Sequence, residues 1–136
     1  MIKFSIILPV RNGGQFVKEC VQSIQAQSYA DFNCIVLDNS STDGTPEWIN
    51  SLGDSRITII PATAPLSIEQ NWARILHVEK NEFMTMVGHD DVFAPDYLAE
   101  MVKLISKHPS ASLYQTHFRY INEHGQTTRL SYPMDE

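Results

Sequence analysis

The stretch Phe32–Thr45, FNCIVLDNSSTDGT, decides the fold. It begins with the apolar run Phe32–Leu37, which is typical of a strand buried on both faces of a sheet. Asp38 ends the run and a polar loop follows. Thr45 then suits the N-cap of a helix, and Pro46 suits its first turn. A buried strand that leads through a polar loop into a helix is the repeating unit of a parallel α/β sheet.

The same order of strand, loop and helix recurs on both sides of this stretch. Lys3–Val10 (KFSIILPV) is a second apolar run, followed by a glycine-containing loop and a helical pattern. Phe83–Val87 is a third run, and a helix is expected from Pro95. Arg56–Ile60 adds a short strand between them. The sequence therefore predicts an α/β protein with three layers, α/β/α, built around a mostly parallel, Rossmann-like sheet.

Local signals predict the remaining elements. Ser67 and Gln70 have the spacing of a capping box that opens a helix. The apolar residues of that helix are expected on its buried face, and they are Ile68, Trp72, Ile75 and Leu76. Leu113–Ile121 and Thr127–Leu130 are predicted to pair as a hairpin.

Size and charge limit the classes of function. The chain has 136 residues, enough for one domain with a sizeable core. Its net charge is −6 and it has no cluster of Lys and Arg, which argues against a nucleic-acid-binding surface. Cys20 and Cys34 are expected to be free, buried thiols, because no secretory signal is present. We expect a cytoplasmic protein, with peripheral association at the inner face of the membrane as an open alternative.

Polar residues directly follow three of the predicted strands. These residues are Arg11 and Asn12, Asp38 and Asn39, and His89, Asp90 and Asp91. In a parallel sheet the carboxyl ends of the strands meet at one edge, where ligands bind. The sequence therefore predicts a binding site at this edge.

The residue types in these clusters leave two interpretations open for each acid. Asp38 can accept hydrogen bonds from a nucleoside, or it can cap its own loop at Ser40 or Ser41. The Asp90–Asp91 pair can hold a divalent cation, or it can belong to a solvated loop. No GxGxxG or GxxxxGK[ST] loop is present, so a bound diphosphate would need another counter-charge, such as a metal ion. His89 can assist such a site or lie passively on the surface.

Several blocks together resemble a known family. They are SIILPVRN, CVQSIQAQSY, FNCIVLDNSSTDGT, GHDD and PDYL. This combination resembles glycosyltransferase family 2, whose members are inverting enzymes with the GT-A fold. The resemblance runs from about Ser5 to Gln126, nearly the whole chain.

The resemblance implies a nucleotide-diphosphate sugar donor, a UDP- or dTDP-sugar, together with Mn²⁺ or Mg²⁺. It also implies transfer to a glycan or lipid-linked acceptor, as in the synthesis of surface polysaccharides. The matched positions divide into three groups. The residues that would face the nucleotide are Pro9, Val10, Arg11, Asn12, Asn71 and Arg74. Asp38 would contact the base, and Asp43 or Ser40 would shape the pocket. Asp90 and Asp91 would hold the metal, and Asp90 would also contact the nucleotide.

The chain departs from the family pattern at two points. Relatives often have an acid two residues before Asp90, where this chain has Gly88. Relatives also continue for a further half that carries the acceptor site and the general base. We therefore expect residues 1–136 to form a single nucleotide-sugar-binding domain without the acceptor half, and no base can be identified, Asp135 and Glu136 included. A non-catalytic binding module and a sugar-phosphate nucleotidyltransferase stay open as alternatives.

Overall fold

The structure is a computed structural model that describes residues 1–131. The chain divides into two compact units, Met1–Glu100 and a second that starts at Met101. The first unit contains the large sheet and the second contains a hairpin. Asp135 and Glu136 lie outside the described residues. Within the described range, no helix has both the length and the apolar character needed to cross a membrane.

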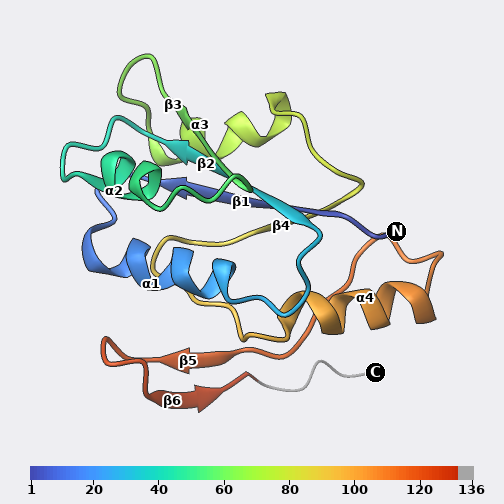
Figure 1. The fold of residues 1–136 in the computed structure, drawn as a ribbon. Coiled ribbons are helices and arrows are strands. Elements are labelled where there is room, and N and C mark those ends of the chain that lie inside the picture. The colour runs from blue at the N-terminus through green and yellow to red at the C-terminus, as the bar shows by residue number, and fades with distance from the viewer. Residues whose placement is uncertain (132–136) are drawn as a thin grey trace. The chain divides into compact units, whose positions relative to one another are not determined.

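The large sheet has four strands, and all of its neighbouring pairs are parallel (Figure 1). The strands are β1 (Phe4–Val10), β2 (Phe32–Asp38), β3 (Ile57–Pro61) and β4 (Phe83–Met86), in the order β3-β2-β1-β4. The chain steps outward from β1 to β3 and then returns to the other side of β1. The strand order therefore reverses between β1 and β4, the kind of position where ligands bind in open α/β sheets.

Helices lie on both sides of this sheet. In the first unit they are α1 (Gly14–Gln25), α2 (Thr45–Ser51), α3 (Ile68–Ala73) and the 3₁₀ helix η1 (Arg74–His77). Helix α4 (Tyr97–Lys107) runs from the first unit into the second. In Figure 1, α1 lies on one side of the sheet and α3 on the other. The predicted three-layer α/β/α arrangement with a parallel sheet is confirmed.

The sequence predicts a longer first strand for the hairpin of the second unit than the structure has. Its strands are β5 (Arg119–Ile121) and β6 (Thr127–Leu130), and they pair antiparallel. The predicted strand from Leu113 is wrong over residues 113–118, which are not in a strand. Helix α4 also begins at Tyr97, two residues later than the predicted start at Pro95.

The core of the first unit forms on both faces of the central strand β1, whose residues are all buried. On one face, Ile7 packs with Ile35 and Leu37, and Ile75 of η1 covers them. Side chains alternate along a strand, so the neighbouring residues of β1 point to the opposite face. There α1 buries one stripe of side chains, Val17, Cys20, Val21 and Ile24.

Cys20 and Cys34 are both free and buried, as expected. Burial raises the pKa of Cys20 to about 12, with smaller contributions from the charges of Asp91 and Asp90. Burial also raises the pKa of Cys34. Both thiols therefore stay protonated near neutral pH.

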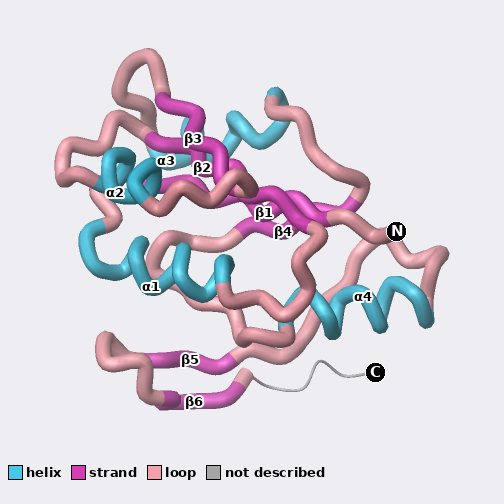
Figure 2. The backbone as a smooth tube through the Cα atoms, in the orientation of Figure 1, coloured by secondary structure: helices cyan, strands magenta, loops and turns pink. Residues whose placement is uncertain are grey.

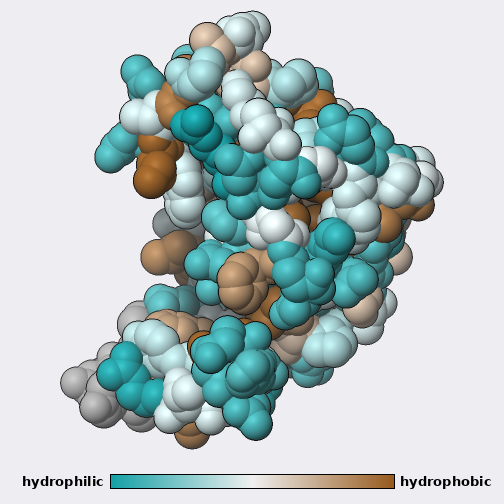
Figure 3. Space-filling model, turned by 90° about the vertical axis from the view of Figure 1, so that its left-hand side faces the viewer, coloured by the Kyte–Doolittle hydropathy of each residue, from teal (hydrophilic) through white to brown (hydrophobic). Residues whose placement is uncertain are grey.

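The helix that follows Ser67 differs from its predicted packing. The capping box of Ser67 and Gln70 is present. However, Ile68, Trp72 and Leu76 are 74%, 42% and 76% exposed, so their predicted burial is wrong. Ile75 is partly buried, and the buried residue of α3 is Asn71. For Leu76 the reason is that α3 changes at Arg74 into a 3₁₀ helix, whose period of about three residues ends the apolar stripe. Hydrophilic residues cover most of the face drawn in Figure 3, where hydrophobic ones form small spots.

The start of α2 also differs from the expectation. The N-cap is Gly44, in the left-handed region with φ 85°, and not Thr45. Thr45 is the first helical residue, and its N–H donates a hydrogen bond to Asp43 Oδ1 at 3.0 Å. Glycine adopts this φ without steric penalty, which explains the choice of cap.

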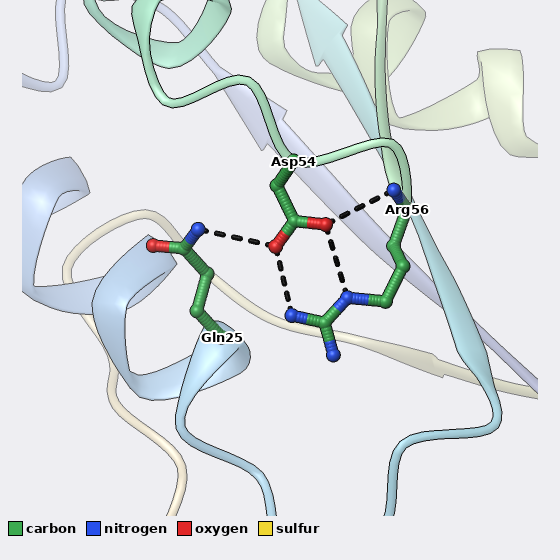
Figure 4. Close-up of polar contacts among 3 residues, drawn as sticks. All are labelled: Gln25, Asp54 and Arg56. Atoms are coloured by element: carbon green, nitrogen blue, oxygen red, sulfur yellow. Dashed lines mark hydrogen bonds and ion pairs between the residues drawn. The ribbon is translucent and has the colours of Figure 1, made fainter.

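A polar cluster joins α1 to the turn before β3 (Figure 4). Arg56 donates from Nε to Asp54 Oδ1 at 3.0 Å and from Nη2 to Oδ2 at 2.8 Å. Gln25, the last residue of α1, donates to the same Oδ2 at 3.1 Å. The hydrogen bonds and charge of Arg56 hold the pKa of Asp54 well below its usual range, despite partial burial.

Candidate functional site

The loops that follow β1, β2 and β4 carry the predicted polar clusters. Because these strands are parallel, their carboxyl ends meet at one edge of the sheet. Figure 2 draws the loops that connect the strands and helices in pink. At this edge Pro9 and Val10 are buried, and Arg11 and Asn12 are exposed. Val10 contributes its backbone, since its carbonyl oxygen accepts a hydrogen bond from Asn39 N–H at 2.8 Å.

The first two loops are tied together by reciprocal hydrogen bonds. The N–H of Asn12 donates to Ser41 Oγ at 2.9 Å, and its side-chain Oδ1 accepts from Thr42 N–H at 2.8 Å. Ser41 and Thr42 were not among the predicted site residues. They lie in the SSTDG segment of the most specific family block, which is the only sequence signal that points to them.

Two non-glycine residues in these loops have left-handed backbone conformations. Asn12 has φ 52° and Ser40 has φ 54°. This conformation disfavours residues with a Cβ, so the surrounding contacts must hold it in place. Such residues are enriched at binding sites, and here one lies in each of the two joined loops.

Asp43 connects the second loop to the start of α1. Its Oδ2 accepts a hydrogen bond from Gly14 N–H at 2.9 Å, and its Oδ1 accepts one from Thr45 N–H. Desolvation raises the pKa of Asp43, but hydrogen bonds from Thr45 and Gly14 outweigh it, so the pKa lies below its usual value. Both oxygens of Asp43 therefore bind backbone, which makes this residue a support for the predicted pocket.

Asp38, the last residue of β2, is only 3% exposed. Its Oδ2 accepts a hydrogen bond from Ser41 N–H at 3.2 Å, which is the loop-capping interaction. Its Oδ1 is buried and has no hydrogen-bond partner within residues 1–131. One carboxylate oxygen of Asp38 thus caps the loop, and the other is a buried acceptor without a donor among residues 1–131. An unpaired buried acceptor is unfavourable unless a ligand or water donates to it.

Asn71 and Arg74 reach the same strand ends from α3 and η1. Asn71 Nδ2 donates to the carbonyl oxygen of Leu37 at 3.0 Å, and Arg74 Nη1 donates to that of Asp38 at 3.0 Å. Arg74 Nη2 donates to Ile60 O at 2.6 Å, so one guanidinium joins β2 to β3. Burial lowers the pKa of Arg74, while the charge of Asp38 opposes the shift. Apart from the hydrogen bond from Arg74 to Asn71 Oδ1, these contacts are to backbone carbonyl oxygens at the strand ends.

Asp90 and Asp91 follow β4 in an exposed turn, closed by a hydrogen bond from Asp91 N–H to Gly88 O at 3.0 Å. A Cβ on Gly88 would lie 2.9 Å from Asp91 Oδ2 and 3.0 Å from Asp90 Oδ1. Both carboxylates therefore fold toward the same point. Desolvation, followed by the charge of Asp90, raises the pKa of Asp91 against the opposing effects of Gly88 and His89.

This donor set suits a metal ion that is shared with a ligand. No group of three His, Cys, Asp or Glu residues that could enclose a metal occurs in the described part of the chain. Mg²⁺ is usually held by one or two carboxylates together with substrate phosphates. Two converging carboxylates fit this arrangement, in which the remaining ligands would come from a diphosphate and from water.

A known protein family matches nearly the whole chain. The model of glycosyl transferase family 2 matches residues 5–134. The chain belongs to glycosyltransferase family 2. Relatives include glycosyltransferase GlyG of Streptococcus pneumoniae, 23% identical over 89% of this chain and 41% of that protein. Glycosyltransferase GlyA of the same organism is 30% identical over 76% of this chain and 15% of that protein. The chain thus spans less than half of either relative.

Solved structures share the fold of this family 2 chain. TarS of S. aureus, residues 1–349, superposes with a TM-score of 0.73 at 22% identity, over 79% of this chain and 33% of that one. Mannosyltransferase PcManGT of Pyrobaculum calidifontis, in complex with GDP-Man and Mn²⁺, has a TM-score of 0.64 at 25% identity, over 76% of this chain and 32% of that one. These neighbours show that the fold is of the GT-A type.

Proposed function

We propose that this chain binds a nucleotide-diphosphate sugar, a UDP- or dTDP-sugar, as the donor site of a glycosyltransferase. The observation that carries the proposal is the buried, unpaired Oδ1 of Asp38 at the carboxyl end of β2. The ring N–H of uracil or thymine is a donor that such an acceptor needs. Two structural relatives support a nucleotide donor, because TarS was crystallised with UDP-GlcNAc and PcManGT with GDP-Man.

Asp90 and Asp91 are proposed to hold Mn²⁺ or Mg²⁺ against the diphosphate. When bound, the ion supplies Lewis-acid stabilisation of the charge on the departing diphosphate. The protein's contribution is to direct both carboxylates toward one point, next to Gly88. The loops joined through Asn12 would keep the base and ribose end of the pocket in place.

The transfer step is proposed by family membership. The acceptor would be a glycan or lipid-linked sugar, in polysaccharide synthesis at the inner face of the membrane. An inverting transfer needs a general base within hydrogen-bond reach of the acceptor hydroxyl. None of residues 1–131 is assigned that role, so donor binding is the part of the proposal that is tested first.

Calorimetric titration of UDP, with Mn²⁺ and again with a chelator, tests the donor site. Wild-type protein should bind UDP more tightly with Mn²⁺, and Asp91→Ala should lose this gain while remaining folded. Asp96→Ala, which removes another exposed carboxylate nearby, is the matched control and should behave as wild type. Unchanged Mn²⁺ dependence in Asp91→Ala would refute the metal role. A folded wild-type protein that binds neither UDP nor dTDP would refute the donor proposal.

A further inference from the structure

Helix α1 and the residue that follows its end make a line of contacts to the segment between β4 and α4. Cys20, Ser23 and Gln27 are spaced i, i+3 and i+7, which places them on one side of the helix and its continuation. Figure 1 shows the yellow-brown segment after β4 passing beside α1. This segment carries Asp90 and Asp91, so the contacts bear on the proposed metal site.

The first contact reaches the turn itself. The Cys20 thiol donates to the carbonyl oxygen of Gly88 at 3.5 Å. The same oxygen accepts the N–H of Asp91, which closes the turn. Cys20 is fully buried in the core, so its sulfur is a fixed point. The turn that presents Asp91 is thus attached to α1 at its closing hydrogen bond.

The second contact lies just beyond the carboxylates. Ser23 Oγ accepts a hydrogen bond from Phe93 N–H at 3.0 Å. The same hydroxyl donates to the carbonyl oxygen of Cys20 at 2.6 Å, which fixes its orientation. One hydroxyl therefore links the helix backbone to the backbone two residues after Asp91.

The third contact fixes the far end of the segment. Gln27 is 6% exposed, and its Nε2 donates to Ala94 O at 2.7 Å while its Oε1 accepts from Leu98 N–H at 3.0 Å. Nε2 also donates to Ser23 O at 3.2 Å. Part of the hydrogen-bonding capacity of this buried amide is used by the backbone of the segment that it holds. Without those partners it would carry the free-energy penalty of an unpaired buried polar group.

We infer that Cys20, Ser23 and Gln27 are positioning residues that hold the Asp90–Asp91 turn in place for a divalent cation shared with a nucleotide diphosphate. The inference rests on the proposed function for the identity of the ligand. Hydrogen-bonding groups behind metal ligands commonly change metal affinity by about 10- to 100-fold when removed. A role limited to anchoring α4 would instead lower stability without a selective effect on metal-dependent binding.

Ser23 provides the sharpest test, because Ser23→Ala removes one hydroxyl and Ser23→Thr keeps it. Two quantities are measured: the amide exchange rate of Phe93 and Asp91, and the Kd for UDP with Mn²⁺ and with chelator. We expect Ser23→Ala to speed the amide exchange of Phe93 and Asp91, because the segment loses its bond to α1, and to weaken Mn²⁺-dependent UDP binding by about tenfold. The Kd in chelator should not change, and Ser23→Thr should restore both values. Gln22→Ala, an exposed glutamine on the same helix, is the control.

The outcomes separate this inference from the proposed function. Unchanged exchange at Phe93 and Asp91 in Ser23→Ala overturns the inference, whatever the protein binds. An equal loss of UDP affinity with and without Mn²⁺ also overturns it, because the effect would then be general. If wild type shows no Mn²⁺-dependent UDP binding, the proposed metal role of Asp90 and Asp91 fails, and the inferred role of Cys20, Ser23 and Gln27 toward the cation fails with it. The exchange rates then report only whether α1 holds the turn.

Discussion

Arg74 donates a hydrogen bond from Nη1 to the backbone carbonyl oxygen of Asp38, at 3.0 Å, beneath a carboxylate whose Oδ1 has no partner in residues 1–131. The guanidinium also binds Ile60 O and Asn71 Oδ1, so it fixes three separate parts of the chain at one point. Its planar group of donors makes this possible, and a lysine ammonium cannot reproduce the arrangement.

Arg74→Lys should therefore lower the free energy of unfolding by about 1–3 kcal/mol, the usual range for hydrogen bonds from charged groups. Because the end of β2 would lose a support, UDP affinity should also fall severalfold. Urea denaturation and calorimetry measure the two effects. Arg119→Lys, an exposed arginine in the second unit, is the matched control and should change neither. A stability equal to wild type would show that the backbone contacts of Arg74 contribute little.

Ser40 offers a test of backbone strain in the second loop. Its φ of 54° is unfavourable for a residue with a Cβ, by roughly 1–2 kcal/mol. Ser40→Gly should relieve this penalty and raise the free energy of unfolding by about 0.5–1 kcal/mol, after the added flexibility of the unfolded chain is subtracted. Thermal or urea unfolding measures the change.

Ser40→Ala is the matched control for that prediction, because it removes the hydroxyl and keeps the Cβ. It should not stabilise the protein. If both variants stabilise equally, the gain comes from the hydroxyl and the strain explanation is wrong. The Ser40→Gly variant should also bind UDP somewhat less tightly, since the loop joined to Asn12 becomes less preorganised.

The sheet was predictable because its strands are almost continuous apolar runs. Phe4–Val10 and Phe32–Asp38 are buried along nearly their whole length, and a pattern of that kind requires cover on both faces. The strand ends followed directly, and with them the positions of Asp38 and the Asp90–Asp91 pair. Both the fold class and the family assignment are confirmed by the comparisons.

The parts that could not be predicted depend on contacts between residues far apart in the sequence. Asn71 of helix α3 is buried where its amide donates to the carbonyl oxygen of Leu37 on strand β2, a contact that no helical periodicity can signal. Asp43 supports the loop through Gly14, 29 residues earlier. The roles of the predicted site residues toward a nucleotide or metal stay predictions, and the binding experiments above test them.

Asp54 predicts a specific pH dependence of stability. Its pKa in the folded protein is lowered by Arg56, below the value of about 3.9 for an unfolded chain. A lowered pKa contributes stability that is present above the unfolded pKa and is lost as pH falls through the folded pKa. Asp54→Asn should therefore lower the free energy of unfolding by about 1–3 kcal/mol at pH 7.

The difference between Asp54→Asn and wild type should be constant above about pH 5 and should shrink below about pH 4. Urea denaturation at a series of pH values measures it. Glu19→Gln, which neutralises an exposed acid on α1, controls for the change in net charge. A difference that stays constant down to pH 2 would mean that the charge of Asp54 is not what Arg56 and Gln25 stabilise.

Gly88 gives a final prediction about the metal site. The carboxylates of Asp90 and Asp91 occupy the space around its missing side chain, at 3.0 and 2.9 Å from the position of a Cβ. Its backbone is not in the left-handed region, so Gly88→Ala should fold. The added methyl group would push the two carboxylates away from their common point. We expect Mn²⁺-dependent UDP binding to weaken about tenfold, while binding in chelator stays the same.

The matched control for Gly88→Ala is Val92→Ala, which changes a 43% exposed side chain on the other side of the carboxylate pair. It should leave both UDP affinities unchanged. Thermal unfolding of each variant separates a local effect from a loss of fold. If Gly88→Ala binds UDP and Mn²⁺ as tightly as wild type, the two carboxylates move freely enough to accept a side chain at position 88. The absence of a side chain at Gly88 would then not be what positions the two carboxylates for a cation.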